Sequence, residues 1–403
     1  MFKTAIVTSG YFPISPVLGG AVESLVLSLI ETNEDKGKTN FVIYSCSNDK
    51  AQELSQRYSN STFVFIDTPS FIQLADKIIY FISKRLLHKE KHLSYRFILQ
   101  RLHYIWAVGR HLSKNDVDKV VFENHPTLLG ALRISDNESH YKDRVYYHMH
   151  NLLPSFFGLK KELMGCRRIL GVSDYVLNEL YSASGEELNR SQLVKVANKV
   201  DESQFTGKLS ADKNRELRQK HGIPESSPIV LFGGRLCEEK GALELIKAFG
   251  LLPQRNATLL ILGSYYYGSG MKSSYELELE ECAKELGDRI KFTGFIDHDA
   301  MPDYYALADV VVAPSVWDDP APLAVIEPLT CGKPLITTKM GGIPEYASDN
   351  IDAIVLPVDA NLISGLANAI ESVLSGRIKL SRKKDSDWSV DSFYFDFLNA
   401  LDD

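Results

Sequence analysis

Short, almost continuously apolar runs alternate with amphipathic stretches along the whole chain. Runs such as TAIVTS (4–9) and PIVLFGG (228–234) are typical of strands that are buried on both faces. The stretches 23–31 and 242–252 repeat apolar residues at i, i+3 and i+4, which indicates helices. Strands that alternate with helices in this way predict parallel sheets built from βαβ units.

The alternation falls into two sets of runs. They are residues 4–9, 41–45, 63–66, 119–123, 144–149 and 167–173, and then 228–234, 257–263, 289–294, 309–315, 333–338 and 352–357. The 403 residues are too many for one ordinary core and suit two. We therefore expect an α/β chain of two Rossmann-like domains, each with its ligand edge at the carboxyl ends of its strands.

The boundary is expected in the stretch 194–227, where a charged segment precedes the next buried strand. We predict a first domain over 1–200, a second over 201–378, and a tail over 379–403. The aromatic stripe of 386–401 must pack somewhere, and a final helix that crosses back onto the first domain would use it.

Composition excludes several classes of protein. The net charge of −7 argues against a polyanion-binding protein, so no nucleic-acid partner is expected. The five cysteines show no CxxC spacing, which argues against a zinc site or disulfide framework and suits a reducing compartment. The amino terminus reads as a first strand and no run reaches the length of a membrane span, so we expect a cytoplasmic protein.

Residues 76–114 differ from the rest, because Lys, Arg and His alternate with large apolar residues and only Asp76 and Glu90 are acidic. Two interpretations remain open. The segment could form two helices with solvated basic faces, or it could lie on an anionic membrane surface as a peripheral contact.

The stretch FGGRLCEEKG (232–241) places Arg235 and Lys240 on a glycine-bracketed loop between a strand and a helix. Such a loop directs backbone N–H groups and the positive helix end to one point, and Gly234 lets the backbone approach a ligand. The pattern fits a diphosphate site, or equally two surface cations that form weak ion pairs with Glu238 and Glu239.

Two acids flank the apolar run that follows PAP (320–322). Asp319 and Glu327 are eight residues apart, and Glu327 would lie on the inner face of a helix, where a carboxylate needs a partner. A ribose diol would supply one. Alternatively, Glu327 caps a neighbouring loop.

Several blocks in order carry a family resemblance. They are GGAVE (19–23), HMHN (148–151), GVSD (171–174), NKVDESQF (198–205), GGRLCEEKG (233–241), the segment 292–315 and GGIPE (341–345). With these blocks the chain resembles the retaining, nucleotide-sugar-dependent glycosyltransferases of family 4, whose GT-B fold has two facing Rossmann-like domains.

The resemblance implies roles in the second domain. Arg235 and Lys240 would bind the donor diphosphate, Glu327 the donor ribose, and Asp319 would lie against the transferred sugar. Asp319 is one methylene shorter than the family glutamate, and PAP replaces a Phe-Gly-like segment, so two prolines offer no N–H there. The remaining donor contacts expected are Gly19, Gly20, Gly234, Phe295, Leu323 and Ala324.

In the first domain the resemblance implies a histidine near the transferred sugar. His150 fits that position best, and His148 is the competing choice. Gly19 and Gly20 would let the domain approach the phosphates or the acceptor. The expected acceptor contacts are His148, Asn151, Glu123, Asn124 and His125, although the last three could equally cap a local turn.

The implied reaction moves a sugar from a nucleoside diphosphate sugar, with UDP favoured, to a hydroxyl of a glycan or lipid-linked acceptor in polysaccharide or cell-envelope synthesis. The DVD (116–118), DHD (297–299) and DSD (385–387) stretches read better as surface segments than as metal sites. No metal or other cofactor is expected, because Arg235 and Lys240 would neutralise the leaving group. The alternatives are a non-catalytic GT-B partner subunit and a nucleotide-sugar epimerase.

Overall fold

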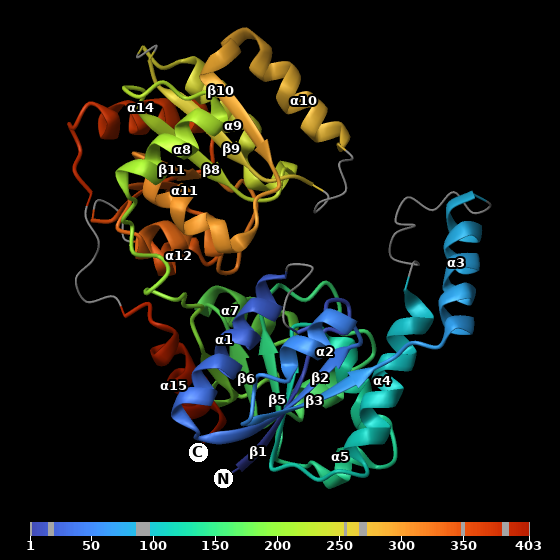
Figure 1. Cartoon of the computed structure of the whole chain (residues 1–403). Coiled ribbons are helices and arrows are strands. Elements are labelled where there is room, and N and C mark those ends of the chain that lie inside the picture. The colour runs from blue at the N-terminus through green and yellow to red at the C-terminus, as the bar shows by residue number, and fades with distance from the viewer. Residues whose placement is uncertain are drawn as a thin grey trace. The chain divides into compact units, whose positions relative to one another are not determined.

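The computed structural model describes residues 2–14, 20–85, 97–253, 256–265, 272–347, 351–380 and 387–402. The chain divides into two compact units, which are coloured by residue number in Figure 1. The first comprises Met1–Val172, Val176–Val196 and Tyr394–Asp403, and the second comprises Ser173–Tyr175 and Ala197–Phe393.

The first unit contains a seven-stranded sheet in the order β3-β2-β1-β4-β5-β6-β7, whose strand pairs are all parallel. The strands are β1 (Phe2–Val7), β2 (Thr39–Cys46), β3 (Ser61–Ile66), β4 (Lys119–Glu123), β5 (Val145–Met149), β6 (Arg168–Gly171) and β7 (Leu193–Lys195). Its central strands are buried along almost their whole length, as their apolar sequences predict.

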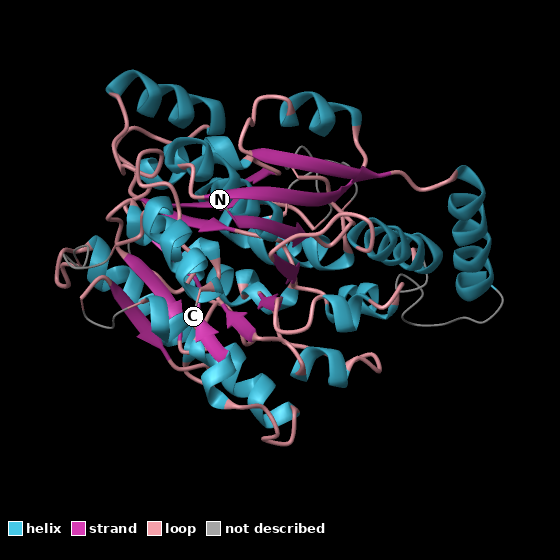
Figure 2. Cartoon of the chain, turned by 90° about the horizontal axis from the view of Figure 1, so that it is seen from below, coloured by secondary structure: helices cyan, strands magenta, loops and turns pink. Residues whose placement is uncertain are grey.

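The helices that follow these strands are α1 (Ala21–Lys36), α2 (Asp49–Ser55), α3 (Ser70–Arg85), α4 (Ile98–Leu112), α5 (Asn137–His140), α6 (Lys160–Met164) and α7 (Asp174–Ala183). A 3₁₀ segment, η2 (Pro126–Arg133), begins just after β4 and packs on α4. Helix α3 projects beyond the edge of the sheet in two perpendicular views (Figures 1 and 2).

The second unit contains a six-stranded parallel sheet in the order β10-β9-β8-β11-β12-β13. The strands are β8 (Ile229–Gly233), β9 (Thr258–Leu262), β10 (Ile290–Gly294), β11 (Val310–Ala313), β12 (Leu335–Thr338) and β13 (Ala353–Leu356). The helices are α8 (Ala211–His221), α9 (Ala242–Gly250), α10 (Ser274–Ala283), α11 (Met301–Leu307), α12 (Leu323–Thr330), α13 (Ile343–Tyr346) and α14 (Leu362–Leu374). Apolar side chains of α9, α10 and α14 fill the core against β8, β9 and β11.

The last helix, α15 (Val390–Leu401), ends in the first unit. There Phe397 and Leu401 are buried, the Tyr146 hydroxyl donates to the Leu401 carbonyl at 2.8 Å, and the Tyr394 hydroxyl bonds to Asn33 Oδ1 at 2.6 Å. Two aromatic residues of the carboxyl-terminal segment, Tyr394 and Phe397, therefore belong to the core of the amino-terminal unit.

These observations confirm the predicted α/β class with two parallel sheets and a returning final helix. Strand β7 was not predicted from the sequence, because its three residues are partly exposed and form no apolar run. No helix in the described part of the chain is both long and apolar enough to span a membrane.

Candidate active site

Several loops of the second unit meet at the carboxyl edge of its sheet. Gly241 has a φ of +70°, and a Cβ there would lie 2.0 Å from the Pro314 carbonyl oxygen, so the loop after β8 rests directly on the loop after β11. The Val316 N–H donates to the Glu239 carbonyl at 3.0 Å, which ties the same loops together. Only a residue without a side chain fits at Gly241.

The loop after β12 completes this edge. The Gly341 N–H donates to Asp318 Oδ1 and the Gly342 N–H donates to the Asp319 carbonyl, both at 2.9 Å. The backbone around Asp319 is therefore fixed by the GGIPE segment before any ligand arrives.

Lys240 and Asp319, predicted separately from two motifs, form an ion pair. Their side chains are 27% and 14% exposed, so the pair is accessible but not freely solvated. Arg235 is exposed on the same loop, immediately after Gly234. The second unit thus presents two cations and one carboxylate at one edge of its sheet.

Glu327 is 3% exposed on α12, and each of its carboxylate oxygens has one partner that the sequence did not predict. Its Oε1 lies 2.7 Å from His298 Nε2, and its Oε2 accepts from the Tyr305 hydroxyl at 2.8 Å. The hydrogen bond to Glu327 raises the pKa of His298, and burial, with the Glu327 charge, raises that of Tyr305. His298 belongs to the DHD stretch, which was interpreted only as a surface segment.

Helix α12 begins at Leu323 after Pro322, which provides no side-chain cap. The first N–H groups of a helix have no acceptor within it, so those of Leu323 and Ala324 can donate hydrogen bonds to an anionic or hydroxyl oxygen. Phe295 is 40% exposed in the loop after β10.

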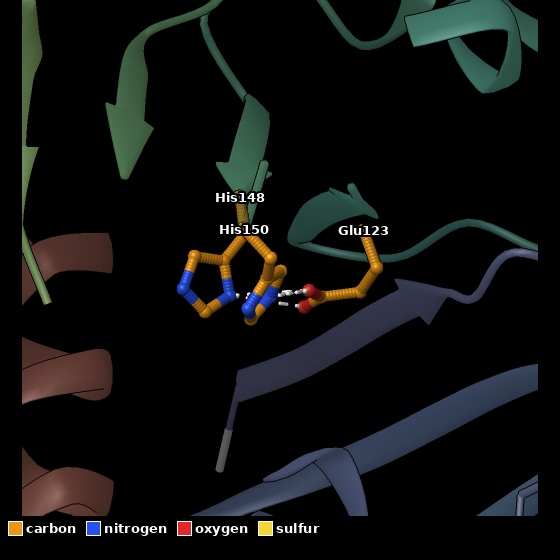
Figure 3. A group of neighbouring side chains, drawn as sticks. All are labelled: Glu123, His148 and His150. Atoms are coloured by element: carbon orange, nitrogen blue, oxygen red, sulfur yellow. Dashed lines mark hydrogen bonds and ion pairs between the residues drawn. The ribbon is translucent and has the colours of Figure 1, made fainter. Parts of the chain in front are cut away.

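In the first unit, Glu123, His148 and His150 form a buried cluster (Figure 3). Glu123 is the last residue of β4 and lies opposite His148 of β5 in the strand register. The two histidines are two residues apart, so their side chains lie on one face. His150 Nε2 lies 2.9 Å and His148 Nδ1 lies 3.1 Å from Glu123 Oε2.

Electrostatics fix the proton position on His150. Burial would raise the pKa of Glu123, but the two histidines outweigh it and lower that pKa to about 2. Burial and then His148 lower the pKa of His150 to about 4. At neutral pH a carboxylate therefore accepts from a neutral His150, whose proton must lie on Nε2. Its Nδ1 is left as an acceptor, and this buried atom has no partner among the described residues.

The remaining predicted residues of the first domain surround this cluster. Asn124 has a φ of +61° and turns the chain after β4, and its Oδ1 accepts from the His150 N–H at 3.3 Å and Asn151 Nδ2 at 3.2 Å. His125 Nδ1 bonds to the Thr127 hydroxyl at 2.8 Å. Glu123 does not cap a turn but joins β4 to β5.

Glu23 of the GGAVE block is a buried acid that was not among the predicted site residues. Glu23 is 4% exposed and accepts from the Ser9 hydroxyl at 2.9 Å, and burial, helped by the nearby Glu123 charge, raises its pKa. Gly20 has a φ of +129°, and a Cβ there would lie 2.3 Å from the Glu23 carboxylate. Gly19 lies outside the described residues.

Glu123, His148 and His150 are also close enough, among the residues described, to be considered for a metal ion. Histidines that bind metals normally donate their second N–H to a carboxylate or carbonyl. Here His148 Nε2 and His150 Nδ1 have no protein partner in the described chain, whereas the nitrogens facing Glu123 are already hydrogen-bonded. Each histidine is therefore held by Glu123 through one ring nitrogen and offers the other nitrogen to a ligand, which is an arrangement that suits a substrate hydroxyl as well as a metal ion.

Comparisons with known proteins agree with this geometry. Residues 213–388 match the family model "Glycosyl transferases group 1", a range that includes Arg235, Lys240, Asp319 and Glu327. The chain is 28% identical over 313 residues to the putative glycosyltransferase YtcC of Bacillus subtilis, covering 75% of this chain and 76% of that protein.

The chain is a glycosyltransferase of the GT-B type.

This glycosyltransferase is also 33% identical over 138 residues to the lipopolysaccharide 1,2-N-acetylglucosaminetransferase of Salmonella typhimurium, which covers 34% of this chain and 36% of that one. The fold matches the crystal structure of Anabaena Alr3699/HepE in complex with UDP with a TM-score of 0.67 at 18% identity, over 100% of this chain and 99% of that chain. It also matches WaaG, a glycosyltransferase involved in lipopolysaccharide biosynthesis, with a TM-score of 0.62 at 16% identity, over 99% and 94% of the two chains.

Proposed function

We propose that this glycosyltransferase transfers a sugar from a UDP-sugar to a hydroxyl of a glycan or lipid-linked acceptor, with retention of the anomeric configuration. The main support comes from the carboxyl edge of the sheet in the second unit. There Arg235, Lys240 and the start of α12 supply positive charge beside Asp319. The choice of UDP is supported by the fold match to Alr3699/HepE, which was solved with UDP and with UDP-glucose.

Charge development explains why these groups belong together. Cleavage of a sugar–phosphate bond builds negative charge on the departing diphosphate. Preorganised cations and helix N–H groups stabilise that charge without solvent reorganisation. We propose that Arg235 and Lys240 take this role, and that Lys240 exchanges or shares its Asp319 partner when the diphosphate binds.

Glu327 would receive the donor ribose on carboxylate lone pairs that His298 and Tyr305 leave unused, since a carboxylate has about four acceptor positions. Asp319 would contact the transferred sugar. While Lys240 is shared between the diphosphate and Asp319, its charge makes Asp319 a weak nucleophile. We therefore favour a front-face route, in which the donor phosphate helps to accept the acceptor proton.

The test replaces each cation separately. Arg235→Ala and Lys240→Ala should each reduce turnover by roughly 10²–10³-fold. Arg215→Ala is the matched control, because Arg215 is an exposed ion-paired cation of the same unit and should leave turnover unchanged. Near-normal rates in both site variants would refute the assignment.

The reaction is proposed to need no metal or other cofactor. Full activity in EDTA is expected, and loss of activity that Mg²⁺ or Mn²⁺ restores would contradict it. Thermal unfolding with UDP, GDP and ADP identifies the base, because a bound nucleotide raises the unfolding temperature by mass action.

The replacement of the usual glutamate segment by Asp319 and PAP supports one alternative, a non-catalytic GT-B partner subunit. Donor hydrolysis by the purified chain separates the two. A catalytic chain should release UDP slowly without an acceptor, whereas a binding subunit should not.

We further propose that the enzyme works as a peripheral protein on the cytoplasmic side of an anionic membrane. Helices α3 and α4 turn large apolar side chains outward, with exposures from 36% to 73%. They are Phe71, Leu74, Ile78, Phe81 and Ile82 on α3, and Ile98, Leu102 and Trp106 on α4. Their spacing places each set on one stripe of its helix.

The charges around the exposed apolar stripes of α3 and α4 favour an anionic bilayer as their partner. The only acid in the described part of 70–114, Asp76, is 1% exposed and accepts from the Leu99 and Gln100 N–H groups at 2.9 Å, so it caps α4. The stripe is accompanied by exposed Lys77 and Arg85, in a chain of net charge −7. An apolar stripe with basic flanks is typical of a helix that lies in an anionic interface.

Vesicle sedimentation tests this surface. The protein should bind phosphatidylglycerol vesicles better than phosphatidylcholine vesicles, and Ile78→Ser with Phe81→Ser should abolish binding. Leu251→Ser with Leu277→Ser is the control, because both residues are equally exposed in the second unit. Vesicle binding by the variant with Ile78→Ser and Phe81→Ser would contradict the membrane assignment. A dimeric wild type that only this double variant converts to monomers would also contradict it, because the face would then be a dimer interface.

A further inference from the structure

Arg101 of α4 is a buried cation with an incomplete set of partners. It is 8% exposed, and its Nε–H donates to the Thr127 hydroxyl at 3.1 Å. Its Cζ lies 4.9 Å from the centre of the Tyr11 ring. Both terminal nitrogens, Nη1 and Nη2, are buried and have no hydrogen-bond partner in the described chain.

This arrangement is costly in the free protein. Arginine does not lose its proton in proteins, so burial cannot be relieved by neutralisation. Burial lowers the pKa of Arg101, and the groups that oppose this effect are the phenols of Tyr11, Tyr104 and Tyr147, not a carboxylate. Buried charges are normally paired, and an unpaired one therefore indicates a missing anion.

The guanidinium lies at the edge of the sheet where ligands bind in folds of this kind. Thr127 and His125 follow β4, and Tyr11 follows β1, so both neighbours come from loops at the carboxyl ends of central strands. The Arg101 charge, after burial, lowers the pKa of His125 to about 4, so that at neutral pH His125 adds no competing cation.

The surroundings are aromatic and partly open. Tyr11, Phe97 and Phe157 are 46%, 40% and 49% exposed, and the Tyr11 ring contacts both Phe97 and His125 edge-on. The His125 ring lies 5.7 Å from that of Phe157. A ligand that displaces the Tyr11 ring would thus find a fixed cation framed by apolar rings.

We propose that Arg101 binds an anionic group, a phosphate or a carboxylate, on the acceptor substrate. Two oxygens of that group would take the fork of Nη1–H and Nη2–H, which matches both anions in geometry. The Tyr11 ring occupies the face of the guanidinium until the acceptor arrives. This inference rests on the proposed function, since it assumes that the first unit holds the acceptor.

Thermal unfolding with inorganic phosphate or acetate, at matched ionic strength and with saturating UDP, tests the site. UDP occupies the diphosphate site, so any remaining anion effect comes from elsewhere. We expect phosphate or acetate to raise the unfolding temperature of the wild type, and the effective anion identifies the group. Arg101→Met should weaken the apparent affinity for that anion at least tenfold. In the absence of the anion, the Arg101→Met variant should unfold at the same temperature as the wild type or at a higher one, because the substitution removes an unpaired buried charge.

Arg110→Met, an exposed arginine on the same helix, is the control and should keep the full anion response. The UDP-induced shift should be the same in all three proteins, so failure of the donor assignment and failure of the anion site are distinguishable. Equal anion protection in Arg101→Met, or none in the wild type, would overturn the proposal. A purely structural arginine would give a different pair of results: Arg101→Met would be strongly destabilised, and the wild type would not respond to anions. That pair of results would also overturn the proposal.

If Arg101→Met does not fold, the Arg101 Nε–H resonance of ¹⁵N-labelled wild type gives a second measurement. Arg101→Lys identifies the resonance by its loss. The proposal expects the anion to shift it, and an unchanged resonance would overturn the proposal.

Discussion

At the scale of single residues, Glu123 determines what His150 can do. Its carboxylate holds the His150 proton on Nε2 and leaves Nδ1 to accept a hydrogen bond, such as one from a sugar hydroxyl. Glu123 itself is fully buried and both of its carboxylate oxygens are bonded to the histidines, so we assign it as a positioning residue. His148 shares the carboxylate and limits its rotation.

We expect Glu123→Gln to lower kcat by about 100-fold or more, because an amide no longer fixes the histidine tautomer. The KM for the donor should change little, since the donor diphosphate is assigned to the second unit. The ¹⁵N shifts of the histidine ring nitrogens should report a mixed tautomer. An active variant with unchanged ring shifts would contradict this role.

His125 provides a pH prediction. Burial, followed by the Arg101 charge, lowers its pKa from 6.5 to about 4, so the unfolded chain binds this proton more readily than the folded one. Stability should therefore fall as the pH drops from 6.5 toward 4.

Urea unfolding as a function of pH checks this. His125→Asn cannot take up the proton and should lose less stability over that interval than the wild type. A pH dependence identical to that of the wild type would show that His125 is not the group responsible.

At the scale of elements, the loop after β8 depends on one backbone conformation. Gly241→Ala should reduce the free energy of unfolding by more than the roughly 1 kcal/mol of a left-handed residue, because its Cβ would also collide with the Pro314 carbonyl. Gly222 has the same left-handed conformation, with φ +61° and ψ +39°, and a Cβ there would meet nothing closer than Lys291 Nζ at 4.0 Å, so Gly222→Ala isolates the conformational cost.

Denaturant unfolding compares the two alanines, and UDP binding should weaken only in Gly241→Ala, since it displaces the neighbouring Lys240. Equal losses of stability in both variants would show that the contact with Pro314 does not constrain the loop.

The elements were largely predictable, because apolar runs with glycine or proline at their ends identify buried strands and the loops that follow them. The partners of Glu327 were not. His298 and Tyr305 lie 29 and 22 residues from it in the chain, and their contact depends on how α11 packs beside α12. Arg101 was likewise hidden in a basic segment, because sequence does not reveal which cation is buried.

At the scale of the whole molecule, the final helix belongs to the core of a unit whose earlier part ends at Val196, some two hundred residues before Tyr394. Phe397 is fully buried there and lies beside His148, with ring centres 5.8 Å apart. The aromatic stripe allowed the return of this helix to be predicted. Its contact with the histidine cluster could not be, because spacing does not reveal register against a distant strand.

Phe397→Ala should cost about 3–5 kcal/mol of stability, as a large buried ring is lost. Phe395→Ala on the same helix is the control, since Phe395 is 39% exposed. Denaturant unfolding, followed by fluorescence and circular dichroism, measures both. A small effect of Phe397→Ala would mean that the first unit is complete without α15.

The return of α15 also sets an order of events at the ribosome. Residues Met1–Val196 are synthesised before the second unit, yet the segment Tyr394–Asp403 that closes their core is synthesised after it. At normal rates of translation this interval lasts on the order of 10–40 s. The amino-terminal half must therefore wait, with an unfilled apolar surface, until the segment Tyr394–Asp403 has also been synthesised.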